Sequence, residues 1–367
     1  MNKRALFLVN TPYQLMIAVS LKNNEFKDCT SDVVITDKIS GYIELSNRVR
    51  KIGIFEKVIE LQVKNTFTDN KIEAFKNRFF GIKENFEDKY DFYLFANLDH
   101  SASAVYGLLK RKNSNIHIYM FEDGLASYSN WYTEFLSMYG AKSKAGKIYK
   151  KNKIKILYHL IVDDVFEKVE RMYLLLPEII TYLPNFEIVK MRPIAYNDED
   201  VVNQYNQIFG YDDSVDAYDK KVIFFEESYY ADGIETNDVE ILGKIAEIIG
   251  KENIFVKIHP RNPDNRFKVL GYKTNVNTSI PWEVIAMNID LKDKILCSIA
   301  SVAVIEPCIM LAKDYIGLFM MNTIGNKSFL KENITDLYRE ICKANKDVIM
   351  VPYQMEEVRN ILCTKKK

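Results

Sequence analysis

Residues 5–23 read ALFLVNTPYQLMIAVSLKN, and this stretch gives the strongest indication of the fold class. A continuous apolar run, Ala5–Val9, ends at a polar turn and is followed by a helical segment. Continuous apolar residues are typical of a strand that is buried on both faces of a parallel sheet. Thr11 and Pro12 suit the N-cap and the first position of the helix. The stretch therefore predicts a buried parallel strand that leads through a short turn into a helix.

The same alternation of strand and helix continues along the chain and predicts open parallel sheets. Predicted strands are residues 31–37, 57–62, 90–97, 116–121, 221–228, 254–260, 294–300 and 315–320. Predicted helices are residues 41–53, 101–112, 238–251, 281–289 and 301–312. Residues 165–176, VFEKVERMYLLL, have helical periodicity and are also predicted as a helix.

The chain has 367 residues, too many for one ordinary hydrophobic core. The alternation stops in the polar, turn-rich segment 192–220, where we expect the domain junction. The predicted fold is α/β, with two Rossmann-like doubly wound domains that face a central cleft. Residues 1–200 form the first predicted domain and residues 201–367 the second, whose last helix is free to pack back on the first domain.

The composition favours a globular protein without a nucleic-acid partner. Apolar residues make up 48% of the chain, and 50 basic residues balance 50 acidic ones, so that no global charge attracts nucleic acid. The five cysteines are scattered without metal-ligand spacing, which favours a reduced, cytoplasmic setting. The N-terminal apolar run is too short for a signal sequence. The terminal TKKK is interpreted first as a solvated tail, with a weak peripheral contact at the inner face of the cell membrane as the alternative.

Ligands of open parallel sheets bind beyond the carboxyl ends of the strands, so the residues there are the candidate site. Glu122-Asp123-Gly124 follows the predicted strand 116–121. A carboxylate in this position can take a proton from an attacking hydroxyl, and the glycine lets a ligand approach closely. An ordinary Asp-Gly turn is the alternative interpretation. Further candidates at strand ends, interpreted as acceptor-binding, are Asn10, Gln14, Asn97 and His100.

His259-Pro260 ends another strongly apolar strand. Lys257 and Arg261 flank the histidine and favour an anionic ligand, to which His259 can donate a hydrogen bond or a proton. A histidine that only caps a turn is the alternative.

One more strand end and one helix start offer groups for a nucleotide. Ser298 and Ser301 lie where a strand enters a predicted helix, whose N-terminus would suit a phosphate. Trp282 could stack on a base and Glu283 could accept from ribose hydroxyls. The alternatives are an N-cap serine without a ligand and a tryptophan that packs in the core. Known phosphate-loop, metalloprotease and serine-hydrolase motifs are absent from the sequence, as is a DxD pair at a strand end, which favours a metal-free nucleotide leaving group.

The acidic-acidic-Gly motif at 122–124, the His-Pro motif at 259–260 and the serines at 298–301 occur in this order along the chain. In this the sequence resembles bacterial sialyltransferases, which carry the first motif in the N-terminal domain and the other two in the C-terminal domain. With its opening NTPYQL it looks most like glycosyltransferase family 52, which includes lipooligosaccharide and capsule sialyltransferases. The likeness covers most of the chain in architecture, and its specificity rests on the joint order of short motifs.

The resemblance implies a GT-B fold and inverting, metal-independent transfer of sialic acid from CMP-Neu5Ac to a galactose-terminated glycan. It implies Asp123 as general base with Glu122 beside it, and His259 at the departing CMP phosphate. The residues that it places around the donor are Lys257, Pro260, Arg261, Trp282, Glu283, Ser298 and Ser301. One departure is Ala300 where the family has the first Ser/Thr of its Ser/Thr-Ser pair. The resemblance also makes a homodimer plausible.

Two other functions stay open from the sequence. One is a GT-B hexosyltransferase that uses a UDP-sugar. The other is a non-catalytic protein that binds a nucleotide sugar. The linkage formed and the natural acceptor are not determined by the sequence.

Overall fold

The computed structural model describes residues 3–63, 86, 88–97, 99–128, 165, 168–180, 184–213, 216–323 and 332–363. The chain divides into two compact units, Met1–Arg192 (unit 1) and Pro193–Lys367 (unit 2). The division falls at the beginning of the polar segment 192–220.

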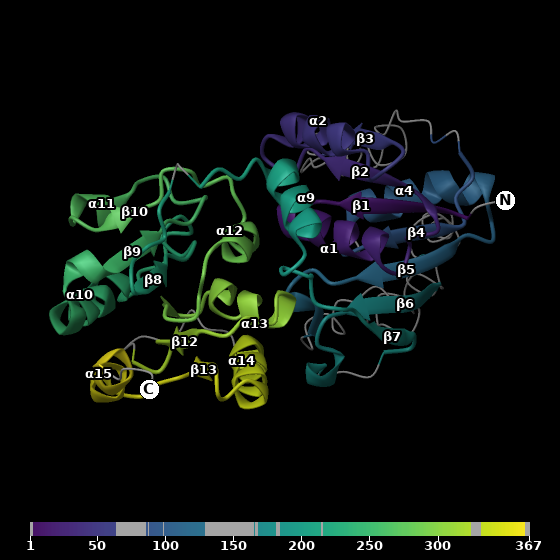
Figure 1. Cartoon of the computed structure of the whole chain (residues 1–367). Helices are drawn as coiled ribbons and strands as arrows, with labels where there is room; N and C mark the ends of the chain where they lie inside the picture. The colour runs from purple at the N-terminus through teal and green to yellow at the C-terminus, as the bar shows by residue number, and fades with distance from the viewer. Residues whose placement is uncertain are drawn as a thin grey trace. The chain divides into compact units, whose positions relative to one another are not determined.

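Unit 1 is built on one parallel sheet (Figure 1). Its described residues form seven strands in the order β3-β2-β1-β4-β5-β6-β7. The strands are β1 (Arg4–Val9), β2 (Thr30–Thr36), β3 (Val58–Leu61), β4 (Phe92–Phe95), β5 (His117–Phe121), β6 (Val169–Leu174) and β7 (Glu187–Lys190). The helices are α1 (Pro12–Asn23), α2 (Tyr42–Ile52) and α4 (His100–Lys112), with 3-10 turns at Ala126–Tyr128 and Pro177–Ile179.

Unit 2 repeats the arrangement with the strand order β10-β9-β8-β11-β12-β13 across its described residues (Figure 1). The strands are β8 (Val222–Phe225), β9 (Ile254–Lys257), β10 (Lys273–Thr274), β11 (Ile295–Ser298), β12 (Ile316–Phe319) and β13 (Ile349–Met350). The helices are α9 (Glu199–Phe209), α10 (Asp238–Ile249), α11 (Arg266–Val269), α12 (Trp282–Asn288), α13 (Glu306–Met310), α14 (Glu332–Ala344) and α15 (Met355–Cys363), and α15 contacts α10. 3-10 turns occupy Lys251–Asn253 and Val302–Val304.

The predicted pair of doubly wound sheets is confirmed. In each sheet the chain starts in the middle, runs to one edge and then returns to continue toward the other edge. The direction therefore reverses between β1 and β4 in unit 1 and between β8 and β11 in unit 2. At such a switch point the loops after the two strands diverge, and the crevice between them is where ligands of these folds bind.

The opening stretch has the local structure that the sequence predicts. Residues 5–9 of β1 are at most 1% exposed, as expected for a strand covered on both faces. Thr11 caps α1, because its hydroxyl oxygen accepts a hydrogen bond from the backbone N–H of Gln14 at 3.1 Å, and Pro12 takes the first helical position.

The helix predicted for residues 165–176 is wrong for residues 169–174, which form the strand β6 between β5 and β7. Met172, Tyr173 and Leu174 are all buried, with Met172 and Leu174 fully so. A short apolar run of this length fits one face of a helix as well as it fits a covered strand. The side of β5 that is not paired with β4 decides the outcome, because a strand that pairs there forms hydrogen bonds for the backbone N–H and C=O groups of residues 169–174.

The continuous helix predicted for residues 301–312 is also wrong. A three-residue 3-10 turn, Val302–Val304, is followed by the five-residue α13. Pro307 lacks an N–H and holds the beginning of α13, so the two pieces do not merge into one helix. The turn after β11 therefore has no long helix behind it to supply a macrodipole.

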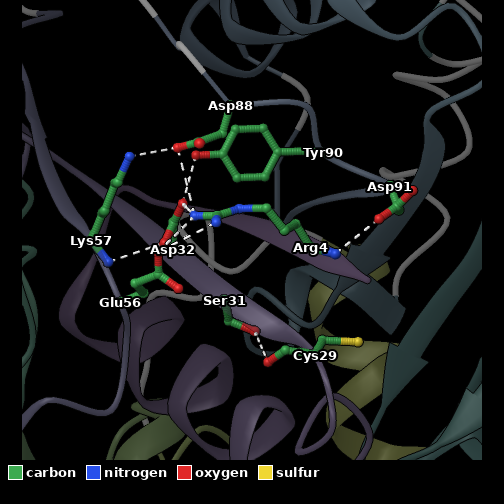
Figure 2. Close-up of polar contacts among 9 residues, drawn as sticks. All are labelled: Arg4, Cys29, Ser31, Asp32, Glu56, Lys57, Asp88, Tyr90 and Asp91. Atoms are coloured by element: carbon green, nitrogen blue, oxygen red, sulfur yellow. Dashed lines mark hydrogen bonds and ion pairs between the residues drawn. The ribbon is translucent and has the colours of Figure 1, made fainter. Parts of the chain in front are cut away.

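A polar cluster stabilises the end of the unit 1 sheet at which the parallel strands begin (Figure 2). Asp32 in β2 is fully buried and accepts hydrogen bonds from Arg4 Nη2 at 2.9 Å, Tyr90 Oη at 2.7 Å and Lys57 N at 3.0 Å. The Arg4 backbone N–H donates to Asp91 at 2.9 Å. The cluster joins residues that begin or precede β1, β3 and β4 to β2.

Across the described residues, no helix is both long enough and apolar enough to cross a bilayer.

Candidate functional site

The predicted carboxylate Asp123 lies beyond the end of β5 and is held by two side-chain amides. Gln14 Nε2, from the first turn of α1, donates to Asp123 Oδ1 at 2.6 Å, and Asn97 Nδ2, from the end of β4, donates to Oδ2. Three residues selected from the sequence as separate strand-end candidates therefore form one cluster. The amides fix the carboxylate in place without neutralising its charge.

Glu122 points elsewhere and is only 1% exposed. It accepts hydrogen bonds from Tyr13 Oη at 2.6 Å, from the Leu175 N–H at 2.9 Å and from Tyr128 Oη. Burial raises the pKa of Glu122, while the two tyrosine hydroxyls lower it. All of these partners lie within unit 1, so Glu122 acts as an anchor for the loop after β5.

The two acidic residues therefore hold the beginning of α1 jointly. Tyr13 binds Glu122 and the adjacent Gln14 binds Asp123. Consecutive residues in the first turn of a helix diverge by about 100°, and consecutive residues at a strand end also point apart. Because both contacts form at once, Tyr13 with Glu122 and Gln14 with Asp123, they fix both the position of α1 relative to β5 and its rotation about the helix axis.

Asn10 connects this cluster to the switch point of unit 1. Its backbone N–H donates to Gln14 Oε1 at 2.6 Å, which orients the amide that Gln14 presents to Asp123. Its side chain donates to Asp99 Oδ2 at 2.9 Å, and Asp99 also forms an ion pair with Lys38. The side chain of His100 lies outside the described residues.

Asp99 and Lys38 were not selected from the sequence. Asp99 also caps α4, since its carboxylate accepts from the Ala102 N–H at 2.9 Å. The signal available in the sequence was an aspartate two residues after the strand-end Asn97. Its charge matters to the site because it raises the pKa of Asp123, whereas Lys38 lowers it.

The environment of Asp123 suits a general base. Burial is the main cause that raises its pKa, the hydrogen bond from Gln14 opposes it, and the Asp99 charge adds to the rise. Gly124 has φ +65°, a left-handed conformation that favours glycine, and among the described residues other than its chain neighbours no atom lies within 4 Å of where a side chain would begin there. Asp123 is partly exposed beside this glycine.

In unit 2, His259 follows β9 and is held in its neutral form. Burial and the nearby charges of Arg261 and Lys257 lower the pKa of His259 to about 4. Its Nδ1 accepts from the Arg261 backbone N–H at 3.2 Å, so in the neutral ring the proton is on Nε2. The ring can donate a hydrogen bond from Nε2, but near pH 7 it carries no positive charge.

Lys257 and Glu283 are a buried pair of opposite charge, exposed by 7% and 8%. Burial lowers the pKa of Lys257, and the Glu283 charge partly restores it. Among the described residues, neither side chain has a hydrogen-bond or ion-pair partner within bonding distance. Buried charges normally have such partners, so this pair can hold a polar ligand.

Three other residues that the sequence analysis assigns to the donor lie at the surface or in the core of unit 2. Arg261 is exposed and its guanidinium binds both oxygens of Asp232 at 3.2 Å. Pro260 is exposed at the turn after β9. Trp282 is 5% exposed and packs edge-on against Phe225, with ring centroids 4.7 Å apart. The structure thus presents Trp282 as a core side chain, and the stacking interpretation is not favoured.

The two predicted serines, Ser298 at the end of β11 and Ser301 in the turn that follows, both have partners within the protein. Ser298 is fully buried, and its hydroxyl contacts Phe225 O at 3.0 Å and Glu227 Oε1 at 2.7 Å, so it is not free for a ligand. Ser301 is partly exposed and caps the 3-10 turn through the Ala303 N–H at 3.4 Å. Glu227 is the second glutamate of FFEES, residues 224–228, and it was not among the site residues predicted from the sequence.

In the described part of the chain, no group of three or more His, Cys, Asp or Glu side chains is placed to hold a metal ion.

Comparisons with known proteins agree with this architecture. The profile of the alpha-2,8-polysialyltransferase (POLYST) family matches residues 5–312. No curated protein matches the sequence at a significant level.

Solved structures with the same fold have little sequence in common with this chain. An alpha/beta-galactoside alpha-2,3-sialyltransferase from the luminous marine bacterium Photobacterium phosphoreum superposes with a TM-score of 0.53 at 10% identity, over 95% of this chain and 98% of that one. TcCGT1 in complex with UDP gives 0.51 at 9% identity, over 99% and 90%. The GT-B domain of a Photobacterium damselae sialyltransferase gives 0.48 at 14% identity, over 95% and 99%. The two doubly wound sheets and the two superpositions with TM-scores above 0.5 show that the fold of the chain is of the GT-B type.

Proposed function

The chain belongs to the alpha-2,8-polysialyltransferase family, and from this premise we propose that it transfers sialic acid from CMP-Neu5Ac to a glycan hydroxyl. The observation that carries the proposal is the Asp123 carboxylate, which Gln14 and Asn97 hold at the carboxyl edge of the unit 1 sheet. The finer assignment, a family 52 enzyme that modifies capsule or lipooligosaccharide, is part of the same proposal.

Asp123 is the proposed general base. Its raised pKa makes the Asp123 carboxylate a stronger base than that of an exposed aspartate. In the proposed reaction the acceptor hydroxyl gives its proton to Asp123 as its oxygen forms the bond to the anomeric carbon of sialic acid. The bond from that carbon to the CMP phosphate breaks in the same displacement, so the configuration inverts.

Unit 2 carries the groups proposed for the donor. Neutral His259 would donate from Nε2 to the leaving phosphate, and Lys257 would offset its charge. Glu283 would accept from the ribose hydroxyls, and Ser301 would donate its hydroxyl to the phosphate. These groups stabilise the departing CMP without a metal ion, which is therefore not part of the proposed mechanism.

The donor is tested by measuring nucleotide release. Purified protein is incubated with CMP-Neu5Ac, or with a panel of UDP-sugars, together with galactose-terminated and sialic-acid-terminated acceptors, with and without a metal chelator. We expect CMP release that depends on the acceptor and is insensitive to the chelator, with the linkage read from the product by NMR. UDP release from a UDP-sugar would instead favour a hexosyltransferase. Binding of CMP-Neu5Ac without turnover on any acceptor would favour a non-catalytic protein.

The acceptor panel covers two expectations. The sequence favours a galactose-terminated glycan, whereas the name of the family implies transfer to the 8-hydroxyl of a terminal sialic acid. Both acceptors offer a hydroxyl to Asp123, and the product linkage distinguishes them. A cytoplasmic location, a peripheral membrane contact and a homodimer belong to the proposal as well, and fractionation and light scattering test them.

His259→Ala is expected to lower kcat by about 10²-fold, because the leaving phosphate loses a hydrogen-bond donor. Since the pKa of His259 is lowered to about 4, its imidazole is neutral across pH 6–8, and its titration should not limit the wild-type rate there. His259→Asn, which retains an N–H donor, should recover part of the lost rate. A rate that falls between pH 6 and 7 in the wild type, but not in His259→Asn, would contradict the neutral-donor role.

A further inference from the structure

The turn after β11 forms an anion-accepting position at the switch point of unit 2, and a side chain of the protein already fills it. Glu227, two residues beyond the end of β8, accepts at Oε1 from Ser298 Oγ at 2.7 Å and from the Ala300 backbone N–H. Ser298 Oγ in turn accepts from the Ser301 N–H at 3.2 Å. The donors that converge on this carboxylate oxygen are of the kind that bind a phosphate oxygen.

We propose that Glu227 is an internal competitor for the phosphate site, and that its carboxylate must be protonated or swing away before a phosphate binds at the Ser298–Ser301 turn. The inference rests on the proposed function in naming a phosphate as the ligand. Glu227 engages the backbone N–H of Ala300, so this contact does not need the hydroxyl group that Ala300 lacks.

Two points bear on the mobility of this carboxylate. The carboxyl group of Glu227 is enclosed by its hydrogen-bond partners, but the residue as a whole is partly exposed, whereas its neighbour Glu226 is buried and its carboxylate is tied to Arg266 Nε at 3.0 Å. Between the strands at a switch point the loops separate, so a side chain there can leave without disturbing the sheet. Glu226 thus anchors the end of β8, while Glu227 extends toward β11.

The competition should depend on pH in the neutral range. Burial raises the pKa of Glu227 to about 7, against the hydrogen bonds from Ala300, Ser298 and Tyr229. The titratable groups that face it are Tyr229 on its own loop, Asp238 on α10 and Tyr338 on α14. Both tyrosines have raised pKa values and stay neutral, and the Asp238 charge adds to the rise for Glu227.

The sign of the effect follows from this pKa. Below pH 7 the carboxyl is mostly neutral and does not repel a phosphate, whereas above pH 7 it is an anion in the position of the ligand. If only the protonated form binds, the affinity scales with the protonated fraction. That fraction changes about tenfold between pH 6 and pH 8 for a group with a pKa of about 7.

The test uses sulfate, whose charge does not change between pH 6 and pH 8, with the full chain and isothermal titration calorimetry. We expect wild-type affinity to fall about tenfold from pH 6 to pH 8, and Glu227→Ala to bind at pH 8 about as tightly as the wild type at pH 6. Glu227→Gln, which keeps the size but not the charge, should lose the pH dependence. Glu235→Gln, at an exposed glutamate nearby in sequence, is the control for net charge and should behave as the wild type.

A pH slope that persists unchanged in Glu227→Ala would overturn the proposal, as would the absence of sulfate binding in Glu227→Ala. Circular dichroism checks that the variants are folded. The sulfate result does not depend on the sugar donor. Failure of CMP release with the expected sulfate behaviour would refute the proposed function alone, and CMP release with a flat sulfate response would refute only the role of Glu227.

Discussion

Asp123→Asn is expected to lower kcat by about 10³-fold, because the acceptor hydroxyl loses its proton acceptor. The substitution keeps the size of the side chain. However, the N–H₂ group of the new asparagine then faces the N–H₂ group of either Gln14 or Asn97, so one hydrogen bond is lost. Donor binding should change little, since the groups proposed for CMP lie in unit 2. The measurement is steady-state CMP release, with the affinity for CMP determined separately.

A neighbouring carboxylate provides the matched control. Asp37 follows β2 at the same edge of the sheet and accepts from the Val63 N–H at 2.8 Å, outside the Asp123 cluster. Asp37→Asn should retain most of the wild-type activity. A rate above a tenth of the wild-type value in Asp123→Asn would remove Asp123 as the base.

The pH dependence of the wild-type rate offers a second check on this assignment. A base must be ionised to act, so kcat/KM should rise with pH through the pKa of Asp123. Because burial raises that pKa, the rise should be centred above the usual aspartate value of 3.8. If the residual activity of Asp123→Asn no longer rises with pH in this range, the rise in the wild type is assigned to Asp123.

Asp32→Ala is expected to lower the free energy of unfolding of unit 1 by about 3 kcal/mol. The substitution leaves Arg4, Tyr90 and the Lys57 N–H without their shared acceptor in a buried position (Figure 2). Arg4 keeps weaker contacts with Glu56 at 3.3 Å and Asp88 at 3.6 Å. Urea unfolding followed by circular dichroism measures the change.

Asp88→Ala is the control within the same cluster. The Asp88 side chain is 28% exposed and binds Lys57 Nζ at 2.6 Å, so we expect a loss of less than about 1 kcal/mol. Equal decreases in the free energy of unfolding in the two variants would show that the buried Asp32 contributes no more to stability than the partly exposed Asp88. At urea concentrations below its unfolding transition, Asp32→Ala should release CMP at close to the wild-type rate. The reason is that the Asp32 cluster lies where the strands begin, whereas Asp123 lies beyond the end at which they finish.

The order of strands and helices was accessible from the sequence because it depends on local periodicity. Ala5–Val9 and residues 116–121 are short, mostly apolar runs that end at turn signals, as is typical of covered strands, and Thr11-Pro12 is a local sequence signal for the start of a helix. Residues 169–174 were assigned wrongly, because a short apolar run carries no period that excludes a helix. There the free edge of a neighbouring strand, which is not a local property, determined the structure.

The sequence by itself determined that two doubly wound domains form and that Asp123 and His259 follow strands, since both facts are written in short stretches of the chain. Only the tertiary structure decided which polar groups meet. Gln14 reaches Asp123 across 109 residues, and Glu227 reaches Ser298 across 71. Such contacts are set by the order of strands in the sheet, which brings distant loops to one edge. For the same reason, Glu122 became an anchor, Trp282 a core residue and Glu227 the occupant of the predicted phosphate position.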